Sequence, residues 1–100
     1  QIAPNLVWVS DTTELTYGRN NKVRLHVVLD LYGRYALSYH ISPTETAEAA
    51  IEAFKRAAKQ AGTFAPMIHT DRGAAYTSND FNNCLTSNNS KHSLSARHSD

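Results

Sequence analysis

Two aspartates occupy similar places in the sequence, each at the end of an apolar run and just before polar residues. Asp11 follows the run at residues 6–10, and Asp71 follows the run at residues 66–70. In α/β sheets, ligands bind at the carboxyl ends of the strands. If both runs are strands and parallel neighbours, their backbones lie about 4.8 Å apart. The two carboxylates would then share one edge of a sheet and could hold a cation between them.

Oxygen-only ligation of this kind suits Mg²⁺ or Mn²⁺, which keep water or phosphate oxygens in their other positions. A two-metal site of this type supports phosphoryl transfer, because one ion activates the attacking oxygen and the other stabilises the leaving oxygen. Taken singly, an aspartate at a strand end is more often a turn former or a helix N-cap than a metal ligand. The interpretation therefore depends on the elements that position the two residues.

The first half of the sequence reads as strands. Residues 6–11 form a short apolar run, typical of a strand covered on both faces. Turn-forming residues fill 16–22. Apolar and polar residues then alternate through 23–30 and again through 35–41, with Gly33 in the turn between them. This period of two predicts an antiparallel hairpin over residues 23–41.

The strongest helix signal follows this hairpin. Residues 42–45 fit a capping box with Pro43 at the first helical position, and Thr44 is the alternative cap. Alanines and two larger apolar residues recur at helical spacing from Ala47 to Ala61, and Gly62 suits the C-terminal cap.

The last third predicts a short strand at 66–71, a loop at 72–76 and a weaker helix capped by Thr77 or Ser78. That helix ends at residues 88–89, and residues 91–94 form a last short strand. The predicted order is three strands, a helix, a strand, a helix and a strand, which is an α/β pattern. Strands joined by crossover helices must pair in parallel.

Composition limits the possible classes. The 100 residues, 41% of them hydrophobic, predict one folded domain rather than a disordered chain. Ten basic residues against nine acidic ones neither imply nor exclude nucleic acid as a partner. There is no leader and no apolar run approaching the roughly 18 residues of a membrane span. A single cysteine, Cys84, excludes a disulfide framework, so we expect a reducing compartment.

Four sequence blocks together resemble one known family. They are Asn-Leu-Val-Trp-Val-Ser-Asp at 5–11, Val-Leu-Asp-Leu-Tyr-Gly-Arg at 28–34, Ile-His-Thr-Asp-Arg-Gly at 68–73 and Tyr-Thr-Ser at 76–78. In order and spacing they resemble the catalytic core of DDE transposases of bacterial insertion sequences, within the retroviral-integrase-like superfamily. The resemblance covers essentially the whole chain.

The resemblance implies a ribonuclease H-like fold, with a five-stranded mixed sheet and flanking helices, and residues 1–100 as one partial catalytic core domain. In that fold the first and fourth strands are parallel neighbours. Asp11 matches the first catalytic carboxylate of the family and Asp71 matches the second, and both would bind Mg²⁺ or Mn²⁺. The implied chemistry is cleavage at element ends and attack of a 3′ hydroxyl on target DNA, without a covalent protein intermediate.

The third acid of the family is a glutamate on a later helix, about seven positions beyond Asp100. Residues 93–97 match the segment that leads to it, so we expect a domain truncated before its last catalytic helix. The glutamates present all precede Asp71 and lie in the wrong blocks. These are Glu14, Glu45, Glu48 and Glu52. We therefore expect residues 1–100 alone to bind metal weakly and to be inactive.

Three basic residues are candidate DNA contacts. Arg72, beside Asp71, either contacts the DNA backbone or pairs with an acid. Lys91 and Arg97 either reach phosphates near the missing helix or are solvated charges.

The remaining polar candidates have simpler interpretations. Asp30 is expected to bond the turn backbone rather than a metal. His69 shares the strand face of Asp71 and either approaches the metal or bonds a loop. His26 and His40 are expected to be cross-strand neighbours on a solvated sheet face. His92 is interpreted as an ordinary residue of a polar segment.

Two functions from different classes follow. The first is a transposase core that acts on element ends and target DNA in the bacterial cytoplasm, as a homo-oligomer, with a separate DNA-binding domain before Gln1. The alternative is a catalytically inactive ribonuclease H-like remnant that dimerises or binds DNA. A related nuclease is a third possibility, against which the block at 76–78 argues.

Overall fold

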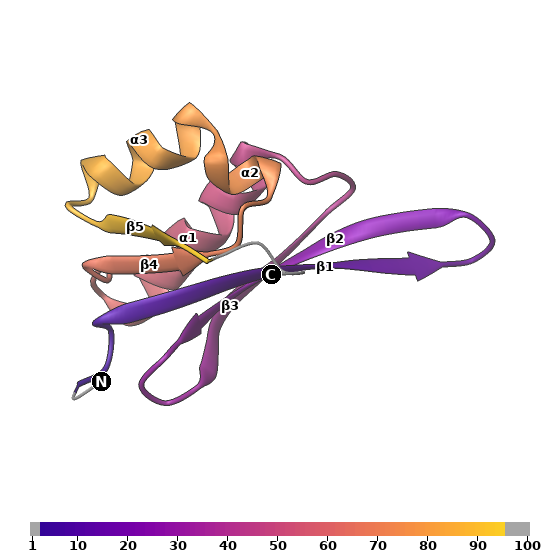
Figure 1. Ribbon diagram of the computed structural model, residues 1–100. Coiled ribbons are helices and arrows are strands. Elements are labelled where there is room, and N and C mark those ends of the chain that lie inside the picture. Colours follow the sequence, from indigo (N-terminus) through magenta and orange to yellow (C-terminus); the bar gives the residue numbers. More distant parts are fainter. Residues whose placement is uncertain (1–2, 96–100) are drawn as a thin grey trace.

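The computed structural model describes residues 3–95, which form one five-stranded mixed sheet with helices packed on one face (Figure 1). The strand order is β3-β2-β1-β4-β5. Strands β1, β2 and β3 pair antiparallel, whereas β4 pairs parallel to β1 and β5 pairs parallel to β4. The predicted α/β class and the adjacency of the first and fourth strands are therefore confirmed.

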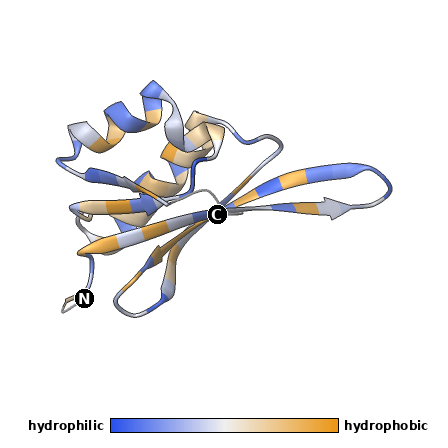
Figure 2. Ribbon diagram, viewed as in Figure 1, coloured by the Kyte–Doolittle hydropathy of each residue, from blue (hydrophilic) through white to orange (hydrophobic). Residues whose placement is uncertain are grey.

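Strands β1 (Val7–Tyr17) and β2 (Asn21–Asp30) form a long hairpin that extends well beyond the helices (Figure 1). Residues 16–22 were expected to be a turn, but the turn is only residues 18–20, where Gly18 adopts a φ of 61°. The strands continue into the predicted turn because their backbones pair as far as Tyr17 and Asn21. Figure 2 shows hydrophobic and hydrophilic residues alternating along both strands.

Strand β3 (Tyr35–Ser42) completes the predicted hairpin with β2, and the register shifts once, between Val28 and Leu29. The chain then crosses over through helix α1 (Ala47–Ala61) to strand β4 (Met67–Thr70). Helices α2 (Ala74–Thr77) and α3 (Asn79–Ser87) connect β4 to strand β5 (Lys91–Leu94). Parallel neighbours require connections of this length.

Helix α1 begins later than predicted. Its N-cap is Thr46, whose hydroxyl accepts a hydrogen bond from the backbone N–H of Ala49 at 3.1 Å. The Ser42 hydroxyl instead bonds the backbone of Thr44, so residues 42–45 form a turn before the helix rather than its cap. Gly62 ends the helix with a φ of 76°, as predicted.

Helix α2 was predicted to be a loop. It is a single turn that the sequence does not signal, and it places the Tyr76 ring in the core. Ser78 caps α3 by accepting a hydrogen bond from the N–H of Phe81 at 3.2 Å, and α3 ends before Asn88, both as predicted.

The core lies between the sheet and the helices. Trp8 of β1 stacks on Phe54 of α1 with ring centroids 6.5 Å apart, and Phe54 contacts Phe81 of α3 at 5.4 Å. All three side chains are completely buried. None of the helices in the described part of the chain has the length and apolarity of a membrane span.

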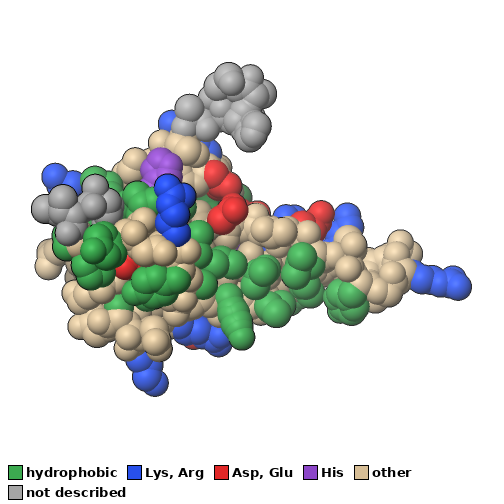
Figure 3. All heavy atoms as spheres, turned by 90° about the horizontal axis from the view of Figure 1, so that it is seen from below, with side chains coloured by type: hydrophobic (Ala, Val, Ile, Leu, Met, Phe, Trp, Pro, Cys, Tyr) green, Lys and Arg blue, Asp and Glu red, His purple; other side chains and the backbone are tan. Residues whose placement is uncertain are grey.

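The other face of the sheet has no helix over it within residues 3–95. Figure 3 shows apolar side chains gathered along this face and onto the long hairpin. Large apolar side chains on its strands are strongly exposed: Leu15, Tyr17, Tyr39 and Ile41.

Candidate active site

The two candidate aspartates belong to adjacent strands in matched register. In the parallel pairing of β1 with β4, Val9 lies opposite His69. Asp11 and Asp71 each follow two residues later. Successive strand residues point to opposite faces, so Asp11 belongs to the face of β1 that carries Val9, whereas Asp71 lies just past the end of β4. The register therefore brings Asp11 and Asp71 to the same edge of the sheet, where the parallel pairing of β1 with β4 ends.

Both carboxylates are exposed, and each is oriented by a nearby backbone N–H group. Oδ1 of Asp11 accepts from the N–H of Thr12 at 2.9 Å, and Oδ1 of Asp71 accepts from the N–H of Gly73 at 2.8 Å. Each carboxylate keeps a second oxygen that is free to take a further ligand.

Asp11 was expected to end its strand, but β1 continues six residues beyond it. The reason is the hairpin, because Asp11 lies opposite Val27 of β2 while the pairing with β4 covers only Val7 to Val9. Asp11 therefore lies just past the end of the parallel pairing with β4, although the strand β1 itself continues.

Gly73 brings a third carboxylate close to Asp71. Its φ of −59° is open to any residue, so the backbone conformation does not require a glycine there. Its lack of a side chain matters instead, because a Cβ there would lie 2.6 Å from Oε2 of Glu45 and 3.1 Å from Oδ1 of Asp71. Glu45, just before α1, thus lies beside the Asp71 loop, although its place in the sequence did not indicate this.

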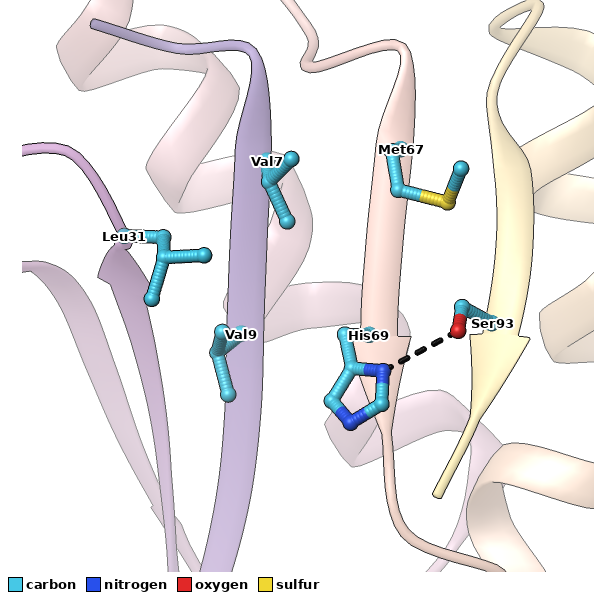
Figure 4. Close-up of a pocket in the computed structure, with 6 residues that line it drawn as sticks. All are labelled: Val7, Val9, Leu31, Met67, His69 and Ser93. Atoms are coloured by element: carbon cyan, nitrogen blue, oxygen red, sulfur yellow. Dashed lines mark hydrogen bonds between the residues drawn. The ribbon is translucent and has the colours of Figure 1, made fainter. Parts of the chain in front are cut away.

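A shallow groove of about 370 Å³ runs along the open face over β1 and β4 (Figure 4). It is lined mainly by apolar side chains of β1 and β4, and His69 closes one side of it. The Nδ1 atom of His69 bonds the Ser93 hydroxyl of β5 at 3.1 Å, so this side chain has a partner within the sheet.

His26 and His40 are cross-strand neighbours, as predicted, with ring centroids 6.4 Å apart. The predicted solvated face is wrong, because His26 is completely buried on the side that faces the helices. Burial is the main cause that lowers the pKa of His26; His40 and Arg24 also lower it, and Glu45 acts in the opposite direction. His26 is therefore a neutral core residue, and its Nδ1 bonds the Thr12 hydroxyl at 3.3 Å.

His92 is also part of the fold rather than an ordinary surface residue. Its Nδ1 bonds Oδ1 of Asn82 at 2.6 Å, and its Nε2 bonds the Thr70 hydroxyl at 2.7 Å. Thr70 immediately precedes Asp71. The polar side chains of α3, which gave no functional signal in the sequence, thus support the end of β4.

The basic candidates have different positions. Arg72 is exposed and directly follows Asp71. Lys91 of β5 lies opposite Met67 of β4. Met67 precedes Asp71 by four residues, so Lys91 and Asp71 are separated by about 13 Å along the strand direction. The structure therefore does not bring Lys91 together with the aspartates. Arg97 lies outside the described residues.

The donor set at this edge consists of carboxylate oxygens, which suits Mg²⁺ or Mn²⁺. No group of three or more His, Cys, Asp or Glu side chains within residues 3–95 is arranged to hold a metal ion. Asp11 and Asp71 are the candidate metal ligands at this edge of the sheet.

The sheet order, the helices of the covered face and the two aspartates define a ribonuclease H-like domain of the retroviral integrase type. Two solved structures of similar proteins match this chain closely. The magnesium complex of the HTLV-2 integrase catalytic core, in its dimeric form, matches with a TM-score of 0.83 and 33% identity over 93% of this chain and 62% of that one. The integrase chain of a simian T-cell lymphotropic virus intasome, in complex with the PP2A regulatory subunit B56 gamma, matches with a TM-score of 0.85 and 32% identity. That match covers 95% of this chain and 33% of that one.

The chain belongs to the integrase core domain family, whose model matches residues 1–100. Among curated relatives, the transposase InsF for insertion sequence IS3fB of Escherichia coli (strain K12) is 34% identical over 97 residues. The match covers 94% of this chain and 33% of the relative, so the chain spans about a third of that transposase. The predicted family is confirmed.

Proposed function

We propose that this chain forms part of a transposase catalytic core, in which Asp11 and Asp71 are two of the three acidic ligands of a DDE-type metal site. The reaction is cleavage of DNA at element ends and transfer of the 3′ end into target DNA. The observation that supports this proposal is the matched register of β1 and β4, in which Val9 lies opposite His69 and each aspartate follows two residues later. Membership of the integrase core family supports it.

The chain itself provides ligands and their orientation. Backbone N–H groups of Thr12 and Gly73 hold one oxygen of each carboxylate, which fixes the direction of the other oxygen. Both groups are exposed, so a DNA backbone can approach them without any opening of the fold. Two divalent ions, when bound, supply activation of the attacking oxygen and stabilisation of the leaving oxygen. Arg72, next to Asp71, is placed to contact a nearby phosphate.

The partners in this proposal are DNA and further copies of the chain. The HTLV-2 integrase core is described in dimeric and trimeric forms, which supports self-association here. The exposed apolar side chains of the open sheet face are consistent with a surface that other protein covers. The free cysteine and the bacterial relatives support the cytoplasm as the place of action. An inactive remnant is less favoured, because both aspartates are present and in register.

The test is strand transfer by the full-length protein in Mg²⁺ or Mn²⁺, with DNA that carries the element ends. We expect Asp11→Asn and Asp71→Asn each to abolish transfer while the circular dichroism spectrum stays unchanged, because each removes a negative charge that offsets the ions. Asp80→Asn is the matched control, since Asp80 is an exposed acid on α3. Transfer at the wild-type rate in either site variant would refute the assignment of that residue. Residues 1–100 alone, with two ligands of three, are expected to bind the ions weakly and not to catalyse.

A further inference from the structure

The buried side chain of Tyr76 joins the two residues on either side of Asp11. The Tyr76 hydroxyl lies 2.7 Å from the Ser10 hydroxyl and 2.7 Å from the Thr12 hydroxyl. Tyr76 is completely buried and Ser10 is 4% exposed, so water does not compete for the Ser10 bond. A phenol donates one hydrogen bond and accepts others, so both contacts can be satisfied together. Burial raises the pKa of Tyr76, and the group therefore keeps its proton.

This contact lies where the sheet no longer links the two aspartates. The pairing of β1 with β4 covers Val7 to Val9, and β4 ends at Thr70. Beyond Val9, strand β1 continues with β2 as its hairpin partner. Tyr76 follows Asp71 by five residues, on the helical turn that the Asp71 loop enters. Its hydroxyl therefore connects the segment bearing Asp11 to the segment bearing Asp71, just past the end of their backbone pairing.

The backbone of the same residue is linked to the residue before Asp71. Nδ2 of Asn82 donates to the Tyr76 carbonyl at 3.0 Å, and Oδ1 of Asn82 bonds Nδ1 of His92 at 2.6 Å. Since this Asn82 oxygen can only accept, Nδ1 of His92 carries a proton, and Nε2 of His92 is hydrogen-bonded to the Thr70 hydroxyl at 2.7 Å. Tyr76 thus has one connection to each aspartate-bearing strand, through its hydroxyl to β1 and through its carbonyl to β4.

We propose that the Tyr76 hydroxyl is a positioning group that holds Asp11 in place relative to Asp71 by fixing Ser10 and Thr12. The inference rests on the proposed function, because it assumes that both aspartates bind the same metal site. Tyr76 itself does not touch the metal or the DNA. Groups that orient metal ligands commonly change metal affinity or activity by about 10- to 100-fold when they are removed.

The test is Tyr76→Phe in the full-length protein, because this substitution removes the hydroxyl and keeps the buried ring. We expect the Kd for Mg²⁺ and for Mn²⁺, measured by calorimetry, to rise about tenfold. The rate of strand transfer should fall at fixed metal and recover as metal is added, while the KM for DNA stays unchanged. Tyr32→Phe is the matched control, since the Tyr32 side chain is 52% exposed and lies in the turn between β2 and β3.

A second variant keeps the test decisive if Tyr76→Phe does not fold. Thr12→Val keeps the branched shape and removes one of the two partners, so it should raise the Kd in the same direction. A Kd for metal within twofold of wild type in the folded variants, with only a lower melting temperature, would overturn the proposal and leave Tyr76 with a purely structural role. Failure of the proposed function is distinguished by Asp11→Asn, which would then bind metal as tightly as wild type.

Discussion

The carboxylate of Asp30 accepts a hydrogen bond from the backbone N–H of Asn5, at 3.1 Å, across the start of the sheet. Its other oxygen accepts from the N–H of Tyr32 at 3.1 Å, as expected of a turn-bonded aspartate. Asn5 adopts a φ of 62°, and its side-chain oxygen accepts from Nε1 of Trp8 at 3.0 Å. Asp30 is completely buried, so this acid orders the backbone before β1 rather than serving a solvent-exposed site.

Asp30→Asn is therefore expected to destabilise the fold without affecting metal binding. An asparagine can accept through only one atom, so an N–H of Asn5 or Tyr32 would face the amide NH₂ group and lose its partner. Leaving a buried donor unpaired costs about 1–3 kcal/mol. Denaturant unfolding would measure the loss of stability, and calorimetry with Mn²⁺ would measure the affinity of the full-length protein. Weakened Mn²⁺ binding with unchanged stability would show that Asp30 belongs to the metal site after all.

The elements that have a periodic pattern of apolar residues were predictable from the sequence. Alternation through residues 23–30 and 35–41 gave β2 and β3 because one face of each strand packs against the helices. The alanine-rich stripe gave α1, and Gly62 marked its end because the left-handed conformation there favours glycine. The family resemblance implied that the strands preceding Asp11 and Asp71 are parallel neighbours, and the pairing of β1 with β4 confirms that adjacency.

Other features depend on contacts between distant residues, and no local pattern carries them. The second half of β1, through Leu15 and Tyr17, is a strand because β2 pairs with it. The bond between Ser10 and Tyr76 joins residues 66 positions apart, so no motif could indicate it. His26 has the sequence pattern of a polar strand position, yet the twist and register of the sheet place it under the helices.

Gly73→Ala should disturb the Asp71 loop while costing little stability. The added methyl group would lie 2.6 Å from Oε2 of Glu45, which can move, and 3.1 Å from Oδ1 of Asp71, which must shift. The φ of −59° imposes no backbone strain. We expect weaker Mn²⁺ binding by the full-length protein and a nearly unchanged melting temperature.

Gly62→Ala is the matched control for this substitution. No atom lies within 4 Å of a Cβ at Gly62, but its φ of 76° strains any residue with a side chain. The left-handed conformation costs roughly 1–2 kcal/mol. Gly62→Ala should therefore lower stability and leave Mn²⁺ affinity unchanged. If Gly73→Ala instead lowered stability and left Mn²⁺ affinity unchanged, Gly73 would be needed for the backbone turn and not for the space beside Glu45 and Asp71.

Phe54→Ala should test whether the layer between α1 and the sheet is the centre of the core. The Phe54 ring contacts Trp8, Phe64 and Phe81, and it is completely buried. Truncating such a residue costs about 3–5 kcal/mol through lost burial and the cavity left behind. Chemical denaturation would measure the change. A loss below about 1 kcal/mol would mean that the helix layer is not packed as described.

The stability of the fold should decrease as the pH falls from 7 toward 5. Burial is the main cause that lowers the pKa of His26 and of His92 in the folded chain, whereas in the unfolded chain both return to about 6.5. Above that pH both states are neutral and the full stability is present. Below it the unfolded chain takes up protons that the folded chain does not, so unfolding becomes more favourable. Each histidine contributes at most about 1.4 kcal/mol per pH unit.

His26→Gln and His92→Gln should each reduce this pH dependence, and the double variant should be nearly flat between pH 7 and pH 5. The charged neighbours of His26 affect how much it contributes to the pH dependence of stability, because His40 and Arg24 oppose its protonation and Glu45 favours it. Denaturant unfolding at a series of pH values provides the measurement. An unfolding free energy that stays constant or increases as the wild-type protein is acidified would mean that these histidines are protonated in the folded state. Each would then be held by an acceptor rather than disfavoured by burial.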